Sequence, residues 1–205
     1  PVQAAPAPSR ELASTDEIPD TQPSSSRRLQ LAARVQLRLV DTNPYVVEAW
    51  RRHFASFPEV RIFHDDLLRV ARHVAISPAN GQGFMDGGID RAYAAFFGSR
   101  LVRRVRDTIL RQPEGHLPVG AAVVVPTGHP VIPHLIVAPT MATPEHVSPM
   151  NAYRSLRAAL RLSGQRAELD GEWFCPGLTT LVGGVAPEDA AKEMAEAYHD
   201  WKSAG

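Results

Sequence analysis

Cysteine is almost absent from this sequence, and its acidic and basic residues leave no net charge. The 205 residues include one cysteine, Cys175, which excludes an internal disulfide framework and a metal site built from several thiolates. Cys175 lies in the apolar segment WFCPG, where a buried thiol is expected rather than a nucleophile. The 22 basic and 22 acidic residues balance, which argues against nucleic acid or an anionic membrane as partner. An anionic ligand must therefore be held by local geometry.

Long apolar runs are also missing from the chain. No stretch approaches the roughly 18 apolar residues that span a bilayer. The N-terminus, rich in Pro, Ala and Ser, lacks the apolar core of a secretion signal. We therefore expect no membrane contact and a cytoplasmic location. Residues 1–29 contain too few large apolar side chains to offset the entropy of ordering, so we predict a disordered tail before one folded domain at 30–205.

Clusters of metal ligands are sparse. His129 and His134 lie five residues apart with no third ligand in evidence, so we expect neither a metal nor another cofactor. The basic segment RLVRRVRD, residues 100–107, has helical spacing. It is expected to be a solvated face, with an RNA- or partner-binding surface as the alternative.

Apolar runs of strand length alternate with segments of helical spacing. Strands are predicted over residues 35–41, 60–63, 74–77, 120–127 and 134–139 and up to Cys175. Helices are predicted over residues 43–57, 90–97, 99–110, 150–162 and 186–201. Asn43 and Pro44 are the expected N-cap and first residue of the first helix. This alternation is typical of a three-layer α/β domain.

Two loops that leave apolar strands and enter helices are rich in small residues. They are SPANGQGFMDGGID, residues 77–90, and PGLTTLVGGVAPEDAA, residues 176–191. Glycine lets the backbone approach a ligand, and a helix N-terminus presents free N–H groups that bind anions without Lys or Arg. In α/β sheets such loops form the ligand site, so the pair predicts a cleft that holds a diphosphate. The GxGxxG fingerprint is absent after the first strand, which argues against an ordinary dinucleotide dehydrogenase.

Four segments, in order and spacing, carry a resemblance to a known family. They are residues 65–68, 77–90, 126–139 and 175–191. Together they resemble the macrodomain, an ADP-ribose-binding module, and most closely a divergent bacterial and phage-associated branch of it. The resemblance implies an α/β/α sandwich with a mixed central sheet. It also implies a ligand: ADP-ribose, free or attached to a protein.

The resemblance assigns binding roles residue by residue. Asp66 would accept a hydrogen bond from the adenine amino group, with the Leu67 amide beside it; the alternative is an acid stabilising a helix N-terminus. Asn80 would bind the hydroxyl groups of the distal ribose, the sugar beyond the diphosphate; the alternative is an Asx-type turn. Backbone amides would hold the two phosphates. Those of the first loop are Gly87, Gly88 and Ile89, and those of the second are Thr180, Leu181, Val182, Gly183 and Gly184.

Acids of the first loop are the candidate catalytic residues. In hydrolytic macrodomains the residue that matches Asp90 helps to position the distal ribose and the attacking water, and Asn80 would assist. Asp86 is an additional acid that the common motif lacks. A first-turn helix acid is the alternative for Asp90. With no histidine nearby, an unperturbed Asp90 predicts a rate that changes little between pH 6 and 8.

Departures from the family pattern leave three functions open. Ser77 replaces an asparagine, Ala94 replaces a histidine, Leu181 replaces a glycine, and Gly183 stands where an aromatic usually covers the distal ribose. The leading hypothesis is an enzyme that hydrolyses ADP-ribose from a modified protein or from an acetyl ester. The second is a non-catalytic reader of ADP-ribose. The third is a nucleotide- or RNA-binding α/β module.

Overall fold

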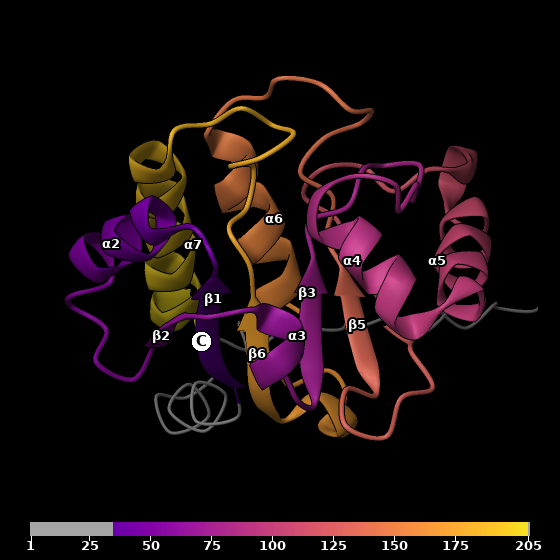
Figure 1. The fold of residues 1–205 in the computed structure, drawn as a ribbon, viewed down its shortest axis with the longest axis horizontal. Coiled ribbons are helices and arrows are strands. Elements are labelled where there is room, and N and C mark those ends of the chain that lie inside the picture. Colours follow the sequence, from indigo (N-terminus) through magenta and orange to yellow (C-terminus); the bar gives the residue numbers. More distant parts are fainter. Residues whose placement is uncertain (1–34, 205) are drawn as a thin grey trace, which may run out of the picture.

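A mixed β-sheet forms the middle layer of the protein (Figure 1). The computed structural model describes residues 35–204, and the tail predicted over 1–29 lies outside them. In this part of the chain the strands are β1 (Val35–Asp41), β2 (Arg61–His64), β3 (Val74–Ser77), β4 (Val123–Pro126), β5 (His134–Val137) and β6 (Gly171–Cys175). Their order is β2-β1-β6-β3-β5-β4; every neighbouring pair is parallel except β4 and β5. The predicted sandwich with a mixed sheet is confirmed.

Helices cover both faces of this sheet. They are α2 (Pro44–His53), α3 (Leu67–Val70), α4 (Gly88–Phe97), α5 (Ser99–Leu110), α6 (Met150–Leu160) and α7 (Pro187–Ala204), with short 3-10 turns at Pro113–Gly115 and Ala167–Leu169. Helices α2, α6 and α7 share one apolar core with the sheet, and α3, α4 and α5 share the other (Figure 1). Among these helices none is long and apolar enough to cross a membrane.

Side chains that alternate between the two faces of each strand form the two cores. Trp173 and Phe174 are neighbours in β6, yet they pack into opposite cores because successive strand side chains point to opposite faces. In β1, Leu39 and Val40 separate in the same way. Strands of this kind, buried on both faces, read as continuous apolar runs, which is why the sequence shows them clearly.

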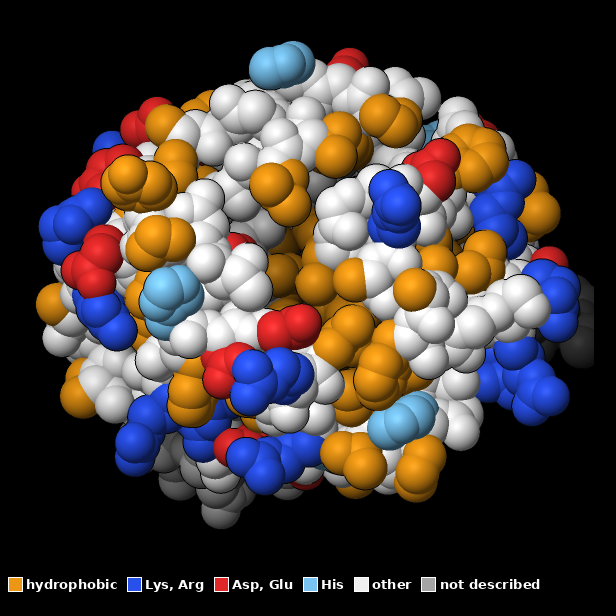
Figure 2. Space-filling model, in the orientation of Figure 1, with side chains coloured by type: hydrophobic (Ala, Val, Ile, Leu, Met, Phe, Trp, Pro, Cys, Tyr) orange, Lys and Arg blue, Asp and Glu red, His pale blue; other side chains and the backbone are white. Residues whose placement is uncertain are grey.

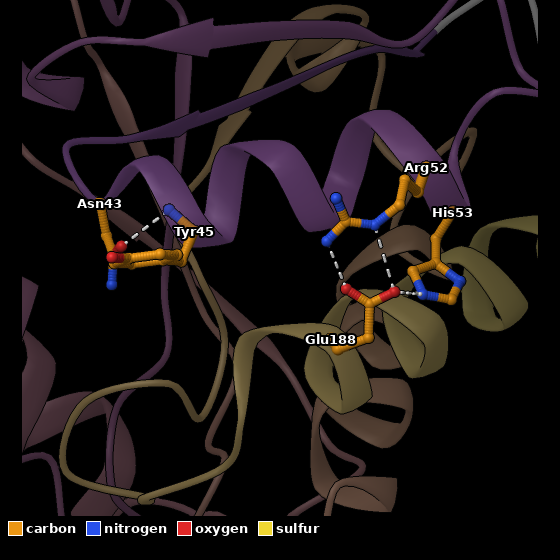
Figure 3. Close-up of polar contacts among 5 residues, drawn as sticks. All are labelled: Asn43, Tyr45, Arg52, His53 and Glu188. Carbon is orange, nitrogen blue, oxygen red and sulfur yellow. Dashed lines mark hydrogen bonds and ion pairs between the residues drawn. The ribbon is translucent and has the colours of Figure 1, made fainter.

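Helix α2 begins as the sequence predicts. Asn43 is its N-cap, and its side-chain oxygen accepts a hydrogen bond of 3.0 Å from the Tyr45 amide (Figure 3). At the other end of α2, Arg52 and His53 both contact Glu188 of α7, at 2.6 and 2.8 Å (Figure 3). These contacts join α2 to the helix that follows the second glycine-rich loop.

The segment 120–127 differs from its prediction. Only Val123–Pro126 forms a strand, and it lies at the edge of the sheet, antiparallel to β5. Val125 alone is fully buried within it. An edge strand has a neighbour on one side only, so an apolar run there stays partly exposed.

Candidate functional site

The carboxyl ends of the parallel strands converge on one cleft. Its volume is about 530 Å³, within the range of small-molecule sites. The residues that follow the strands and line it include Thr42 after β1, Asp65 and Asp66 after β2, Asn80 after β3, Thr140 after β5 and Gly177 after β6. Figure 2 shows the hollow, with hydrophobic side chains in its depth and acidic side chains beside it.

The two glycine-rich loops form opposite walls of the cleft. A Cβ atom on Gly87 would lie 3.5 Å from Val182 Cγ2, and one on Gly88 would lie 3.7 Å from Leu181 Cδ1. Leu181 and Val182 are 70% and 43% exposed, at the mouth of the cleft. Loops about 100 residues apart in the sequence therefore lie next to each other at the cleft.

The first loop ends in a backbone arrangement suited to an anion. Gly87 is the N-cap of α4, and glycine has no side chain. No capping side chain therefore accepts a hydrogen bond from the first-turn amides. Gly88 has φ of +51°, a left-handed conformation that glycine adopts without strain. Ile89 also lines the cleft. An anion at this position would meet the positive end of the α4 dipole.

The second loop is folded more tightly than the sequence suggests. Thr179 has φ of +64°, an outlier for a β-branched residue, and its carbonyl accepts a hydrogen bond of 3.1 Å from the Val185 amide. A Cβ on Gly183 would lie 2.6 Å from that same carbonyl oxygen. An aromatic residue at position 183 is therefore incompatible with this loop conformation. Leu181, Val182 and Gly183 line the cleft, whereas Thr180 and Gly184 are not among its lining residues.

Asp66 has the helix-capping role that was its alternative, and it also lines the cleft. It is the N-cap of α3, and its Oδ1 accepts a hydrogen bond of 2.8 Å from the Leu68 amide. Asp66 and Leu67 also line the cleft. Within residues 35–204 the other carboxylate oxygen, Oδ2, makes no hydrogen bond, so it can accept one from a ligand.

Asn80 has the local role that was its alternative. Its Oδ1 accepts hydrogen bonds from the Gln82 and Phe84 amides at 3.1 and 3.2 Å, and its Nδ2 donates to the Phe84 carbonyl at 3.0 Å. The side chain lines the cleft but is engaged in shaping the loop. The side chain therefore has little hydrogen-bonding capacity left for the hydroxyl groups of a ribose.

Asp90 is the buried acid of the site. Its side chain lies in the cleft wall with the residue only 7% exposed, and the Ser77 hydroxyl donates a hydrogen bond of 2.5 Å to its Oδ1. Burial raises the pKa of Asp90 to about 7; the Ser77 hydrogen bond opposes this shift and the charge of Asp86 adds to it. The expectation of an unperturbed carboxylate is therefore wrong. Sequence reasoning identified the residue but not its burial.

Two further predicted positions have clear places. Asp86 is exposed and lines the same cleft as Asp90. Ala94, one turn further along α4, packs against the core shared with α3 and α5, so no imidazole approaches Asp90 from that position. Ser77, which replaces the asparagine of the family pattern, contacts Asp90 directly.

Sequence reasoning missed several lining residues, including Asp41, Thr42, Phe84, Thr140, Met141 and Thr179. Asp41 shows why they matter. Its Oδ1 accepts from the Asn43 amide at 2.8 Å, and its Oδ2 accepts from the Gly177 amide at 3.0 Å. It thereby joins the end of β1 to the second loop. An acid at a strand end, two residues before a helix cap, was the available signal.

Comparison with known proteins assigns the class and then the family. An α/β/α sandwich with a ligand cleft at the carboxyl edge of its sheet defines a small-molecule-binding α/β protein. Residues 76–194 match the Macro domain family. An uncharacterised protein of Aquifex aeolicus is 32% identical over 143 residues, which cover 67% of this chain and 79% of that protein. The chain belongs to the Macro domain family.

Solved structures share the fold. The macrodomain of Mycobacterium tuberculosis DarG aligns with a TM-score of 0.57 and 22% identity, over 66% of this chain and 87% of that one. A mutant of the Oceanobacillus iheyensis macrodomain, solved with ADPR, aligns with a TM-score of 0.56 and 17% identity, over 66% and 74% of the two chains. At these identities the likeness establishes the fold alone.

Proposed function

We propose that the cleft binds ADP-ribose and that the protein hydrolyses ADP-ribose from a modified protein or from an acetyl ester. The observation that carries the proposal is one cleft lined by Asp66, by both glycine-rich loops and by the buried Asp90. Family membership and the ADPR-bound relative support the choice of ligand. A cytoplasmic location is proposed with it, consistent with the free, buried thiol of Cys175.

The ligand would lie across the carboxyl ends of the strands. Free Oδ2 of Asp66 accepts from the adenine amino group at one end. The diphosphate lies between the Gly87–Ile89 amides and the Leu181–Gly183 backbone. The distal ribose then reaches the end of the cleft that carries Asp86 and Asp90.

Hydrolysis at that end uses the two acids differently. Water attacks the anomeric carbon or the ester carbonyl of the distal ribose, the bond to the leaving oxygen breaks, and a proton passes to that oxygen. Ionised Asp90, oriented by Ser77, holds the attacking water and the ribose. Asp86 is the second carboxylate near the scissile bond, and Asn80 shapes the loop that carries it.

A non-catalytic reader is the second candidate, and two observations favour it. Asn80 already engages both atoms of its amide in the loop, and Ala94 provides no imidazole. Such a site would retain affinity for ADP-ribose while turning over no substrate.

One experiment separates these functions. Calorimetric titration with ADP-ribose measures binding, and incubation with ADP-ribosylated protein or O-acetyl-ADP-ribose measures release. A hydrolase binds and releases, and Asp90→Asn loses release while its affinity stays within about tenfold. A protein that binds but releases nothing from any substrate is a reader. Absence of binding overturns both.

A further inference from the structure

Phe84 is a large apolar side chain held open at the cleft. It lines the cleft wall and stays 42% exposed. Its backbone is fixed from both sides, because Asn80 accepts from its amide and donates to its carbonyl. A fixed backbone with an exposed aromatic ring is the arrangement of a residue that packs against a ligand.

Arg106 holds the ring of Phe84. Its guanidinium carbon lies 4.4 Å from the ring centroid, and its Nη1 donates a hydrogen bond of 2.6 Å to the carbonyl of Gln82 in the same loop. The neighbouring Arg103 bonds only to Ser99 on its own helix, among its described contacts. The basic face of α5 is therefore not uniformly solvated: Arg106 fixes the first loop.

The second loop leaves room for such an aromatic. Gly183 has no side chain, and a Cβ there would meet the Thr179 carbonyl at 2.6 Å. Phe84 thus supplies an aromatic surface from the first loop, two residues before Asp86, which lines the same cleft. Sugar rings offer an apolar face of C–H groups, which packs on aromatic rings.

We propose that Phe84 is a specificity-determining residue that packs on the sugar beyond the diphosphate, and that Arg106 is its positioning residue. The proposal rests on the proposed function, because it presupposes that ADP-ribose occupies the cleft. It predicts a selective effect on affinity. ADP has the adenosine and diphosphate but lacks this sugar, so substitution of Phe84 should leave the affinity for ADP unchanged.

Titrations of Phe84→Ala with ADP-ribose and with ADP test the first part. We expect the affinity for ADP-ribose to fall about tenfold and that for ADP to stay within about twofold. Phe84→Tyr keeps the ring and retains affinity. The matched control is Phe96→Ala, since Phe96 is similarly exposed at 45% but lies outside the set of cleft-lining residues. Equal losses for the two ligands in Phe84→Ala would overturn the assignment.

A double-mutant cycle tests the role of Arg106. Arg106→Gln removes the cation over the ring and, because its side chain is two bonds shorter, the hydrogen bond to the Gln82 carbonyl; it should weaken ADP-ribose binding about threefold. In the Phe84→Ala background it should change nothing further, because its effect passes through the ring. Arg103→Gln is the control and should have no effect. Additive losses, or a loss shared by ADP, would overturn the positioning role. If the wild-type protein binds neither ADP-ribose nor ADP, the proposed function and this inference both fail. That outcome differs from the variant results above, which overturn this inference alone.

Discussion

Asp90 combines burial with a position in the cleft wall, and its pKa of about 7 gives the proposed reaction a pH dependence. Below this pKa the carboxyl is protonated and cannot orient water as an anion. The ionised fraction grows about tenfold between pH 6 and 8, so the rate of ADP-ribose release should rise by about that factor. Initial rates across this range measure it, and a flat profile would contradict the role of ionised Asp90.

The same burial affects stability. The folded-state pKa of Asp90 lies above its ordinary value of 3.8, so its contribution to stability is fully present below that value and is lost as pH rises through about 7. Asp90→Asn removes this loss. At each pH the relevant quantity is the unfolding free energy of the variant minus that of wild type. This difference should be about 2–3 kcal/mol larger at pH 8 than at pH 5. Urea denaturation at both pH values measures the difference, and an equal difference at the two pH values would contradict the burial effect.

At Asp66, substitution by asparagine separates capping from ligand recognition. Asn is an equally good N-cap, so Asp66→Asn should keep α3 intact. It replaces a carboxylate that accepts from adenine with an amide that can also donate. Wild type should prefer ADP-ribose over its hypoxanthine analogue, which has an oxygen acceptor in place of the amino group, by about tenfold. The variant should prefer neither, and an unchanged preference would show that adenine does not contact Asp66.

Among the elements, α4 offers a matched pair of glycines, one at each of its ends. Gly88 and Gly98 both have positive φ, at +51° and +80°, but only Gly88 lines the cleft. Alanine at either position should cost at least about 1 kcal/mol of stability because of backbone strain. Only Gly88→Ala should also weaken ADP-ribose binding. Paired denaturation and calorimetry measure both effects, and equal binding by the two variants would refute the phosphate-loop role.

Most elements could be predicted from the sequence because their apolar periodicity is strong. The helices α2, α4, α5, α6 and α7 and the buried strands all show it. The order of the strands could not be predicted, since β6 lies between β1 and β3 through contacts remote in sequence. The glycines of the cleft carried a local signal. Phe84 and Thr140 carried none, because their exposure and place depend on how distant loops meet.

On the scale of the whole molecule, charge sets the salt dependence of binding. Among residues 35–204, no Lys, Arg or His lines the cleft, whereas Asp41, Asp65, Asp66, Asp86 and Asp90 do. A diphosphate there depends on backbone amides and works against nearby carboxylates. Raising NaCl from about 50 to 500 mM screens that repulsion, so the affinity for ADP-ribose should stay constant or rise up to about threefold. Calorimetry at both concentrations checks this, and a tenfold loss would reveal a basic contact.

Insertion of β6 between β1 and β3 has a consequence for how the protein acquires its site during synthesis. The second loop follows β6, and its Gly177 is held by Asp41, 136 positions earlier. While the ribosome still holds residues 171–204, the nascent chain has the first loop but lacks its opposing wall and the central strand. The cleft therefore forms only when the last strand enters the middle of the sheet, a step dominated by long-range contacts and correspondingly slow. Ligand-binding competence therefore follows the synthesis of β6 and of the second loop, and not that of the first loop alone.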